Sequence, residues 1–225
     1  MRNLQRAGGI AAGVEALAYI VGFAVMATWL NPGDTQGWTA ADKLAFVLER
    51  RTLFELWTVL IYVVASSALL VLAVALHERL KERSPTMQIA TPVGVIWAGL
   101  VIASGMVSIC GLQSVAALQA KDPALAVSTW VAVGVVQNGL GGGIEIVGGV
   151  WSLMVSAVAW RTGALPQALN VLGAIVGVAG ILTVFSPLKD LVMIFGLGQI
   201  PWFVGLGVVM LRGDRSPTAN LAPQS

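Results

Sequence analysis

The chain has 225 residues, of which 57% are hydrophobic and only 11% charged, and its mean hydropathy is +0.84. Soluble domains are about 25% charged, so this composition excludes an ordinary soluble globular protein. The formal net charge of +2 is too small and too dispersed for nucleic-acid binding, so no nucleic-acid partner is expected.

Long uncharged runs predict an all-α polytopic membrane protein. A membrane-spanning helix needs about 20 apolar residues, and only helices and closed barrels satisfy every backbone polar group in lipid. We expect one domain over residues 1–212, a bundle of six transmembrane helices with short interfacial helices, and a disordered tail over residues 213–225. The uncharged runs are 16–33, 56–76, 84–120, 123–144, 162–188 and 191–211.

The first predicted membrane helix covers residues 7–30, which is too long for a signal-peptide core. It ends at Asn31-Pro32-Gly33, a strong helix breaker. A short amphipathic helix follows, because Thr39 with Asp42 three residues later fits a capping box. We expect this helix to lie at the membrane interface. Its apolar face is Ala41, Leu44, Ala45 and Leu48.

The remaining helices are placed by apolar runs and by proline. Asp122-Pro123 reads as the N-cap and first turn of a helix over residues 123–137, which we expect to be interfacial or partly re-entrant. The other predicted membrane helices cover residues 53–76, 92–118 (opening at Pro92), 138–160, 166–185 and 191–211.

Six crossings would place both termini on one side, and basic residues indicate which side. Lys and Arg favour cytoplasmic loops. The tryptophans Trp29, Trp57 and Trp160 fall where an interfacial belt is expected. We therefore expect a multi-pass protein of the bacterial inner (plasma) membrane with cytoplasmic termini. The basic residues on the terminal side are Arg2, Arg6, Arg79, Lys81, Arg83, Arg161, Arg212 and Arg215, against Lys43, Arg50, Arg51, Lys121 and Lys189 opposite.

One segment carries a family resemblance. Residues 161–181, RTGALPQALNVLGAIVGVAGI, contain a Gly-x-Leu-Pro turn followed by Leu and Leu-Gly on the next helix. This pattern resembles the cytoplasmic hairpin of a bacterial six-helix integral membrane protein family classed as a domain of unknown function. The resemblance implies a fold and no activity. Its residues here are Gly163, Leu165, Pro166, Leu169, Leu172 and Gly173.

Few residues could support metal or nucleophilic chemistry. His77 is the single histidine and Cys110 the single cysteine, so haem, zinc and cysteine-ligated clusters are not expected. No cofactor and no catalytic residue is predicted. An enzyme with Glu15 or Glu145 as general acid and base ranks last, because no nucleophile–base pair accompanies either acid.

Three glutamates, Glu15, Glu55 and Glu145, fall within the predicted spans. An ionisable residue at the bilayer centre costs about 2.5 kcal/mol or more and is a functional hypothesis by default. Glu55 follows Arg51 by four residues, so a surface ion pair is the alternative explanation there.

Glu145 lies in GLGGGIEIVGGVW, residues 139–151. At helical spacing the small residues share its face, and bulky residues lie opposite. Counting from Trp160 at about 1.5 Å per residue places Glu145 about 22 Å from the inner interface. Two alternatives stay open: a neutral acid that joins helices through Gln113, Asn138 or Tyr62, or an ionised acid in a hydrated cavity.

These residues predict a protein that binds or transports a small molecule, with an intramembrane glutamate as proton or ligand site. Its pocket would open outward. The alternative is a non-catalytic subunit or assembly factor that uses small-residue helix faces as interfaces in a homo- or hetero-oligomer. The expected partners are the lipid bilayer and a small-molecule or lipid ligand. The candidate residues are Glu145, Glu15, Glu55, Tyr62, Gln113, Asn138 and Gln199.

Overall fold

The computed structural model describes residues 2–212, and every regular element in this part of the chain is a helix; η1 and η2 are π-helical and η3 is a 3-10 helix. The predicted disordered tail, residues 213–225, lies outside the described residues. The elements in chain order are α1 (Arg2–Ala27), α2 (Ala40–Glu49), α3 (Arg51–Thr58), η1 (Val59–Val64), α4 (Ala65–Leu80), α5 (Met87–Gln119), α6 (Pro123–Gln137), η2 (Asn138–Gly142), α7 (Ile146–Thr162), α8 (Gln167–Leu182), η3 (Ser186–Leu188) and α9 (Leu191–Arg212).

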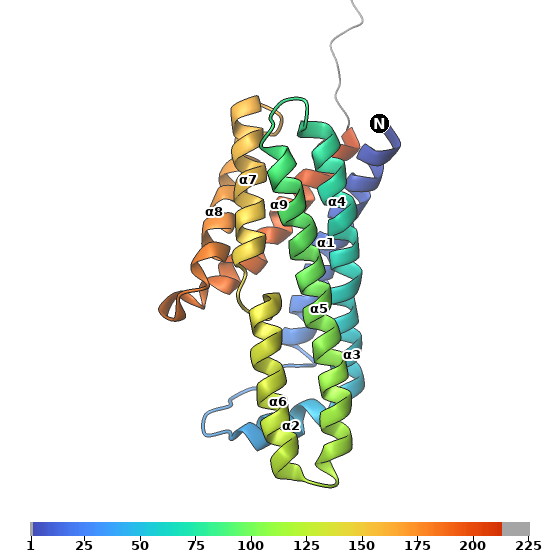
Figure 1. The fold of residues 1–225 in the computed structure, drawn as a ribbon, viewed down its shortest axis with the longest axis vertical. Helices are drawn as coiled ribbons and strands as arrows, with labels where there is room; N and C mark the ends of the chain where they lie inside the picture. The colour runs from blue at the N-terminus through green and yellow to red at the C-terminus, as the bar shows by residue number, and fades with distance from the viewer. Residues whose placement is uncertain (1, 213–225) are drawn as a thin grey trace, which may run out of the picture.

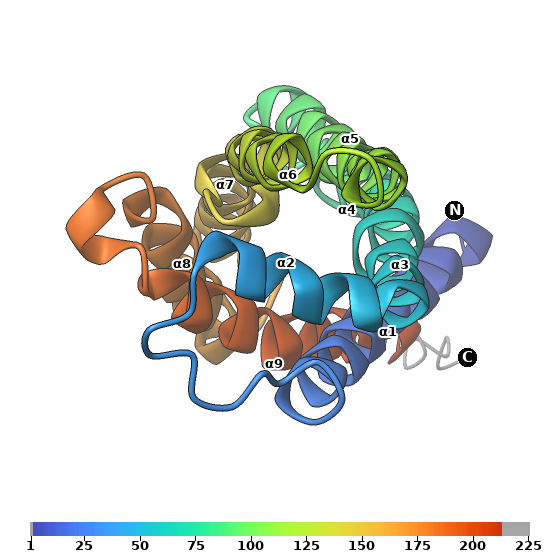
Figure 2. The ribbon, with the colours of Figure 1, turned by 90° about the horizontal axis from the view of Figure 1, so that it is seen from below.

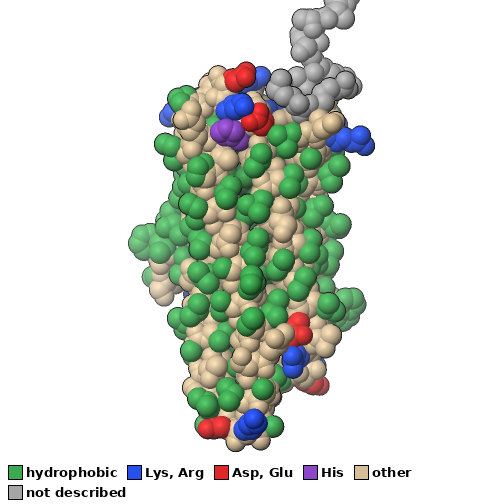
Figure 3. Space-filling model, turned by 45° about the vertical axis from the view of Figure 1, so that its right-hand side comes forward, with side chains coloured by type: hydrophobic (Ala, Val, Ile, Leu, Met, Phe, Trp, Pro, Cys, Tyr) green, Lys and Arg blue, Asp and Glu red, His purple; other side chains and the backbone are tan. Residues whose placement is uncertain are grey.

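The helices identify a multi-pass membrane protein. Within residues 2–212, 5 helical stretches are long and apolar enough to cross a membrane. A space-filling view shows hydrophobic side chains along the length of the molecule and charged ones gathered at its two ends (Figure 3). The apolar helix α8 has only 16 residues, so the six-crossing bundle stays a prediction. The 5 stretches are 3–27, 51–80, 87–119, 123–162 and 191–212.

The long helices form an elongated bundle in which α1 packs between α4 and α9, and α5 between α4 and α7 (Figure 1). The start of α1 and the end of α9 lie at the same end, as an even number of crossings requires. At the opposite end, α2 lies across the bundle beside α6 (Figure 2). Aromatic side chains fill the core: Trp151 contacts Trp97 in a tilted arrangement and Trp202 edge to face, each at a centroid distance of 5.6 Å.

Both predicted helix caps are confirmed. The Thr39 hydroxyl accepts from the Asp42 backbone N–H at 3.2 Å, and the Asp42 carboxylate accepts from the Thr39 backbone N–H at 2.8 Å. The Asp122 carboxylate accepts from the Leu125 N–H at 3.0 Å, at the start of α6. The apolar face of α2 is centred on Leu44, which packs on α5 and α6 within the protein.

Two helices begin earlier than predicted. The α3–η1–α4 stretch covers residues 51–80 and so includes charged residues at both ends, because charge limits burial in lipid but not helix formation. α5 begins at Met87, so Pro92 lies inside it. Pro92 lacks the N–H that would reach the Gln88 carbonyl, but Gln88 is exposed near the helix start.

The predicted membrane helix over residues 138–160 is wrong at its start. The π-helical segment η2 ends in a break, with φ +107° at Gly141, and α7 begins only at Ile146. Glycine reaches this region of φ without steric cost. α6 packs along α5 and leads through the break into α7 within one apolar stretch of 40 residues.

Candidate functional site

A central cavity of about 510 Å³ lies inside the bundle, between α1, η1, α4, α5, the break after η2, and the start of α9. Small-molecule sites commonly measure about 300–1,000 Å³. The lining residues are Glu15, Tyr19, Gly22, Phe23, Met26, Ala27, Asn31, Trp57, Ile61, Tyr62, Ala65, Ser66, Leu69, Trp97, Val101, Gly141, Gly142, Glu145, Val192, Met193, Phe195 and Gly196.

Glu15 enters the cavity from the middle of α1. Its neighbours on α1 are small, which lets α4 and α9 pack against that helix. The residue is only 2% exposed; its carboxylate has a backbone hydrogen bond from Leu69, whereas its Oε1 atom has no hydrogen-bond partner among the described residues. A buried polar atom without a partner costs about 1–3 kcal/mol. The fold therefore retains a strongly hydrophilic group at an unfavourable position.

Glu145 enters the same cavity from the break between η2 and α7. It occupies the N-cap position of α7, where the positive end of the helix dipole favours a carboxylate. Its backbone N–H donates to the Thr183 hydroxyl at 2.9 Å, and its carbonyl accepts from the Gly149 N–H at 2.8 Å. These bonds hold the backbone of Glu145 in place, and its side chain lines the cavity.

Aromatic side chains and the two acids determine the chemistry of the cavity. None of the described residues that line it is Lys, Arg or His. Trp57 was expected in an interfacial belt, but it turns inward and its indole N–H donates to the Gly22 carbonyl at 3.0 Å. The six aromatic side chains that line the cavity are Tyr19, Phe23, Trp57, Tyr62, Trp97 and Phe195.

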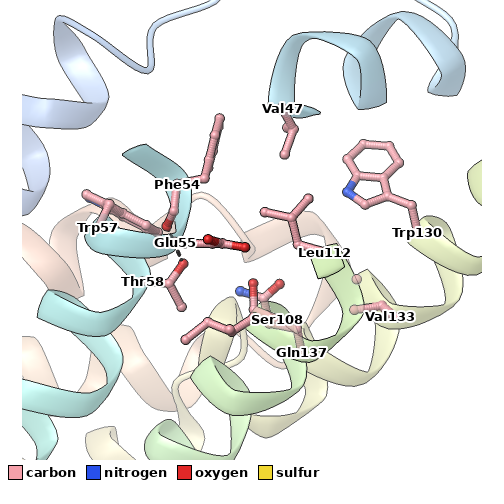
Figure 4. A pocket seen from close by; sticks show the side chains of 12 residues that line it. Val47, Phe54, Glu55, Trp57, Thr58, Ser108, Leu112, Trp130, Val133 and Gln137 are labelled. Carbon is pink, nitrogen blue, oxygen red and sulfur yellow. Dashed lines mark hydrogen bonds between the residues drawn. The ribbon is translucent and has the colours of Figure 1, made fainter. Parts of the chain in front are cut away.

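A second cavity of about 190 Å³ lies between α3, α5 and α6, beneath α2 (Figure 4). Glu55 lines this cavity and not the central one, and its carboxylate bonds the Arg51 guanidinium at 2.8 Å. This is the ion pair that their spacing of four residues suggested. Thr58, also in the wall, donates to the Phe54 carbonyl at 2.8 Å.

Tyr62 and Gln137 lie where the two cavities approach each other. Tyr62 lines the central cavity and Gln137 the second one, and the Gln137 amide donates to the Tyr62 hydroxyl at 3.5 Å. Tyr62 is in the π-helical η1, and Gln137 is the last residue of α6, immediately before the π-helical η2. The Ser104 hydroxyl donates to the Gln137 carbonyl at 3.0 Å, which compensates the disturbed helix bonding there. π-helical segments often mark functional sites.

The structure brings together only some of the residues predicted to share one pocket. Glu15, Tyr62 and Glu145 line the central cavity. Gln113 and Asn138 are exposed and line neither cavity, and Gln199 is fully buried where its amide donates to the Ser152 hydroxyl at 3.2 Å.

Several cavity residues were not among the predicted site residues. Tyr19 lies four residues after Glu15, so helical spacing already placed it on the same face. Trp97 and Phe195 carry no such signal, because they reach the cavity through the packing of α5 and α9 against other helices.

The small-residue face shared by α7 and α8 is occupied within the chain. A Cβ atom on Gly149 would lie 2.6 Å from the Gly177 carbonyl oxygen, so α7 and α8 approach at backbone contact. Gly173 similarly faces Ser156 and Trp202. The small residues of α7 therefore join helices of one chain, and a partner interface stays a prediction.

Comparison of the chain with known protein families gives one match. The model of a domain of unknown function, DUF4386, matches residues 6–212. No curated protein and no solved structure matches the chain. Within residues 2–212, no group of three or more His, Cys, Asp and Glu side chains is placed to hold a metal ion.

Proposed function

Since the chain belongs to the DUF4386 family, whose description carries no activity, we propose its function from the cavity: it binds or transports a small molecule within the membrane, with Glu145 and Glu15 as its proton or ligand site. One observation carries the proposal. A cavity of ligand size inside an apolar bundle contains two carboxylates and no basic side chain among the described residues that line it.

The shape of the cavity supports entry from the end opposite the chain termini. The cavity follows α1 from Glu15 to Ala27, about 18 Å at about 1.5 Å per residue. Its lining residues at that end, Met26, Asn31 and Met193, are exposed. We place the six-crossing domain, residues 1–212, in the inner membrane with cytoplasmic termini, so that this mouth faces outward.

Thermal unfolding in lipid nanodiscs tests whether the cavity binds a ligand. A panel of small cations, anions and neutral molecules is compared on the wild type and on Val101→Trp, which fills the cavity. We expect at least one compound to raise the Tm of the wild type and not that of the variant. Ser66→Leu serves as a second filling variant if Val101→Trp unfolds without ligand. If no compound raises the Tm of the wild type more than that of the cavity-filling variants, the proposal is wrong.

The role of the glutamates requires a separate measurement. A compound from that panel is titrated into weakly buffered protein while released or absorbed protons are counted. We expect the proton exchange of the wild type to be lost in Glu145→Gln. Glu49→Gln, at the exposed end of α2, is the matched control. Unchanged exchange in Glu145→Gln and in Glu15→Gln would exclude both acids as proton sites.

A further inference from the structure

We propose that the central cavity selects an organic cation, a positively charged nitrogen centre that carries apolar groups. The inference rests on the proposed function and adds the chemical class of the ligand. It follows from the combination of two carboxylates with aromatic walls in one cavity.

The two acids of the cavity, when ionised, favour a positive partner. Glu15 and Glu145 both line it, and no basic side chain is among the described residues of its wall. The Oε1 atom of Glu15 is in a residue only 2% exposed and has no hydrogen-bond partner among the described residues, so it is available to a ligand in the cavity. A cation would supply the charge compensation that a buried carboxylate needs. A neutral molecule could donate a hydrogen bond to a carboxylate but would not compensate its charge, and an anion would add repulsion.

The walls of the cavity indicate that the cation is organic. Aromatic faces attract cations through their negative quadrupole, and aromatic cages are used to bind quaternary ammonium groups. Trp57 and Tyr62 meet edge to face at 5.9 Å, and Trp97 packs against Phe195 at 6.0 Å, so rigid aromatic pairs lie in the wall. Aliphatic side chains such as Ile61 and Val101 supply apolar contact for substituents.

A bare metal cation fits the cavity poorly. Ca²⁺ takes about 6–8 oxygen ligands within about 2.6 Å, whereas oxygen-bearing side chains are a minority of this lining. The volume of about 510 Å³ also far exceeds what one ion needs. The arrangement therefore favours a molecule of several carbon atoms over an inorganic ion.

Three probes of similar size separate charge from shape: benzyltrimethylammonium, its uncharged carbon analogue neopentylbenzene, and benzenesulfonate. Each is measured by equilibrium dialysis against the protein in nanodiscs, with empty nanodiscs subtracted. We expect the ammonium probe to bind at least tenfold tighter than the other two. Since protons and cations compete for the carboxylates, its affinity should rise with pH.

Variants link this binding to the cavity. Glu15→Gln and Glu145→Gln should each weaken the ammonium probe at least tenfold, while Glu145→Asp, which keeps the charge, retains part of the affinity. Trp97→Leu should weaken the ammonium probe more than neopentylbenzene, because only the cation uses the aromatic face. The exposed Glu49→Gln should change nothing.

The outcomes distinguish this inference from the proposed function. Tighter binding of neopentylbenzene or benzenesulfonate, abolished by Val101→Trp, would overturn the cation assignment and leave the cavity as a ligand site. Ammonium binding that survives both Gln variants would overturn the assignment to these acids. Failure of all three probes would overturn the cation inference, and the wider panel would then decide whether the cavity binds any small molecule.

Discussion

The environment of Glu15 distinguishes two roles for this buried acid, ligand binding and the joining of helices. A carboxylate that merely joined helices would have both oxygens paired; the Glu15 carboxylate has a backbone hydrogen bond from Leu69 of α4, but its Oε1 atom has no partner among the described residues. Residues that serve a ligand are often unfavourable for folding, because the ligand and not the protein satisfies them. The two roles therefore predict opposite effects on stability.

We expect Glu15→Met to stabilise the unliganded protein by about 1–3 kcal/mol, since it removes a buried oxygen without a partner and keeps similar volume. Thermal unfolding in nanodiscs, followed by tryptophan fluorescence, measures the change. Glu49→Gln, on an exposed side chain, should shift stability by less than about 0.5 kcal/mol. A clear loss of stability in Glu15→Met would instead support a neutral acid that holds helices together.

At the scale of elements, the sequence predicts well where local hydrogen bonds decide the structure. Thr39 with Asp42, and Asp122 with Pro123, form caps from residues three apart or fewer, so their geometry is independent of the rest of the fold. The break at Gly141 was missed because a run of glycines permits both a helix and a turn. The packing of η2 on α5 and α6, which the sequence does not show, accompanies the turn that forms.

The cap of α2 gives a prediction in pH. Hydrogen bonds from the Thr39 side chain and backbone N–H lower the pKa of the Asp42 carboxyl. Its stabilisation is therefore fully present above the unfolded value of about 3.9, and it is lost as pH falls through the lower folded pKa. We expect Asp42→Asn to reduce hydrogen-exchange protection in the first turn of α2 at pH 7.

The same comparison in acid tests the cause. Once the wild-type carboxyl is protonated, below its lowered pKa, wild type and Asp42→Asn should have equal protection factors. Glu49→Gln, at the other end of α2, should leave first-turn protection unchanged at either pH. A difference between wild type and Asp42→Asn that persists unchanged in acid would exclude the carboxylate as its source.

The break before α7 gives a prediction about the position of Glu145. At φ +107°, Gly141 occupies a region that side chains rarely adopt, so Gly141→Ala should cost about 1–3 kcal/mol. The strain should also weaken ligand binding at Glu145, four residues on. Gly139→Ala, at negative φ with open space around it, is the matched control and should change stability little. Equal stability of the two variants would show that Gly141 does not determine the break.

At the scale of the molecule, the sequence predicted the lipid environment and the two intramembrane acids. It did not predict which residues surround those acids. Helical spacing linked Glu15 to Tyr19 because both are on one helix. Helical spacing could not link Glu145 to Trp97, which is on a different helix, nor place Gln113 on the outer face of the bundle. Those relations depend on how the helices rotate against one another, which apolar composition alone leaves undetermined.

The number of crossings depends on α8. At about 1.5 Å per residue, α8 is about 24 Å long, whereas α5 is about 50 Å long and the hydrocarbon core about 30 Å thick. The turn between α8 and α9 accordingly lies far short of the loop between α5 and α6 along the bundle axis (Figure 1). That turn contains Lys189 and Asp190, which must reach water if α8 crosses.

Cysteine labelling decides the topology. On a Cys110→Ser background, Lys189→Cys and Lys121→Cys should react with a membrane-impermeant maleimide in spheroplasts, while Ser84→Cys should react only after permeabilisation. Six crossings with cytoplasmic termini require this pattern, because α8 then thins the bilayer locally to carry Lys189 across. If Lys189→Cys instead labels together with Ser84→Cys, α8 does not cross. The termini would still share one end of the bundle, and α8 with the start of α9 would be a re-entrant hairpin beside the cavity.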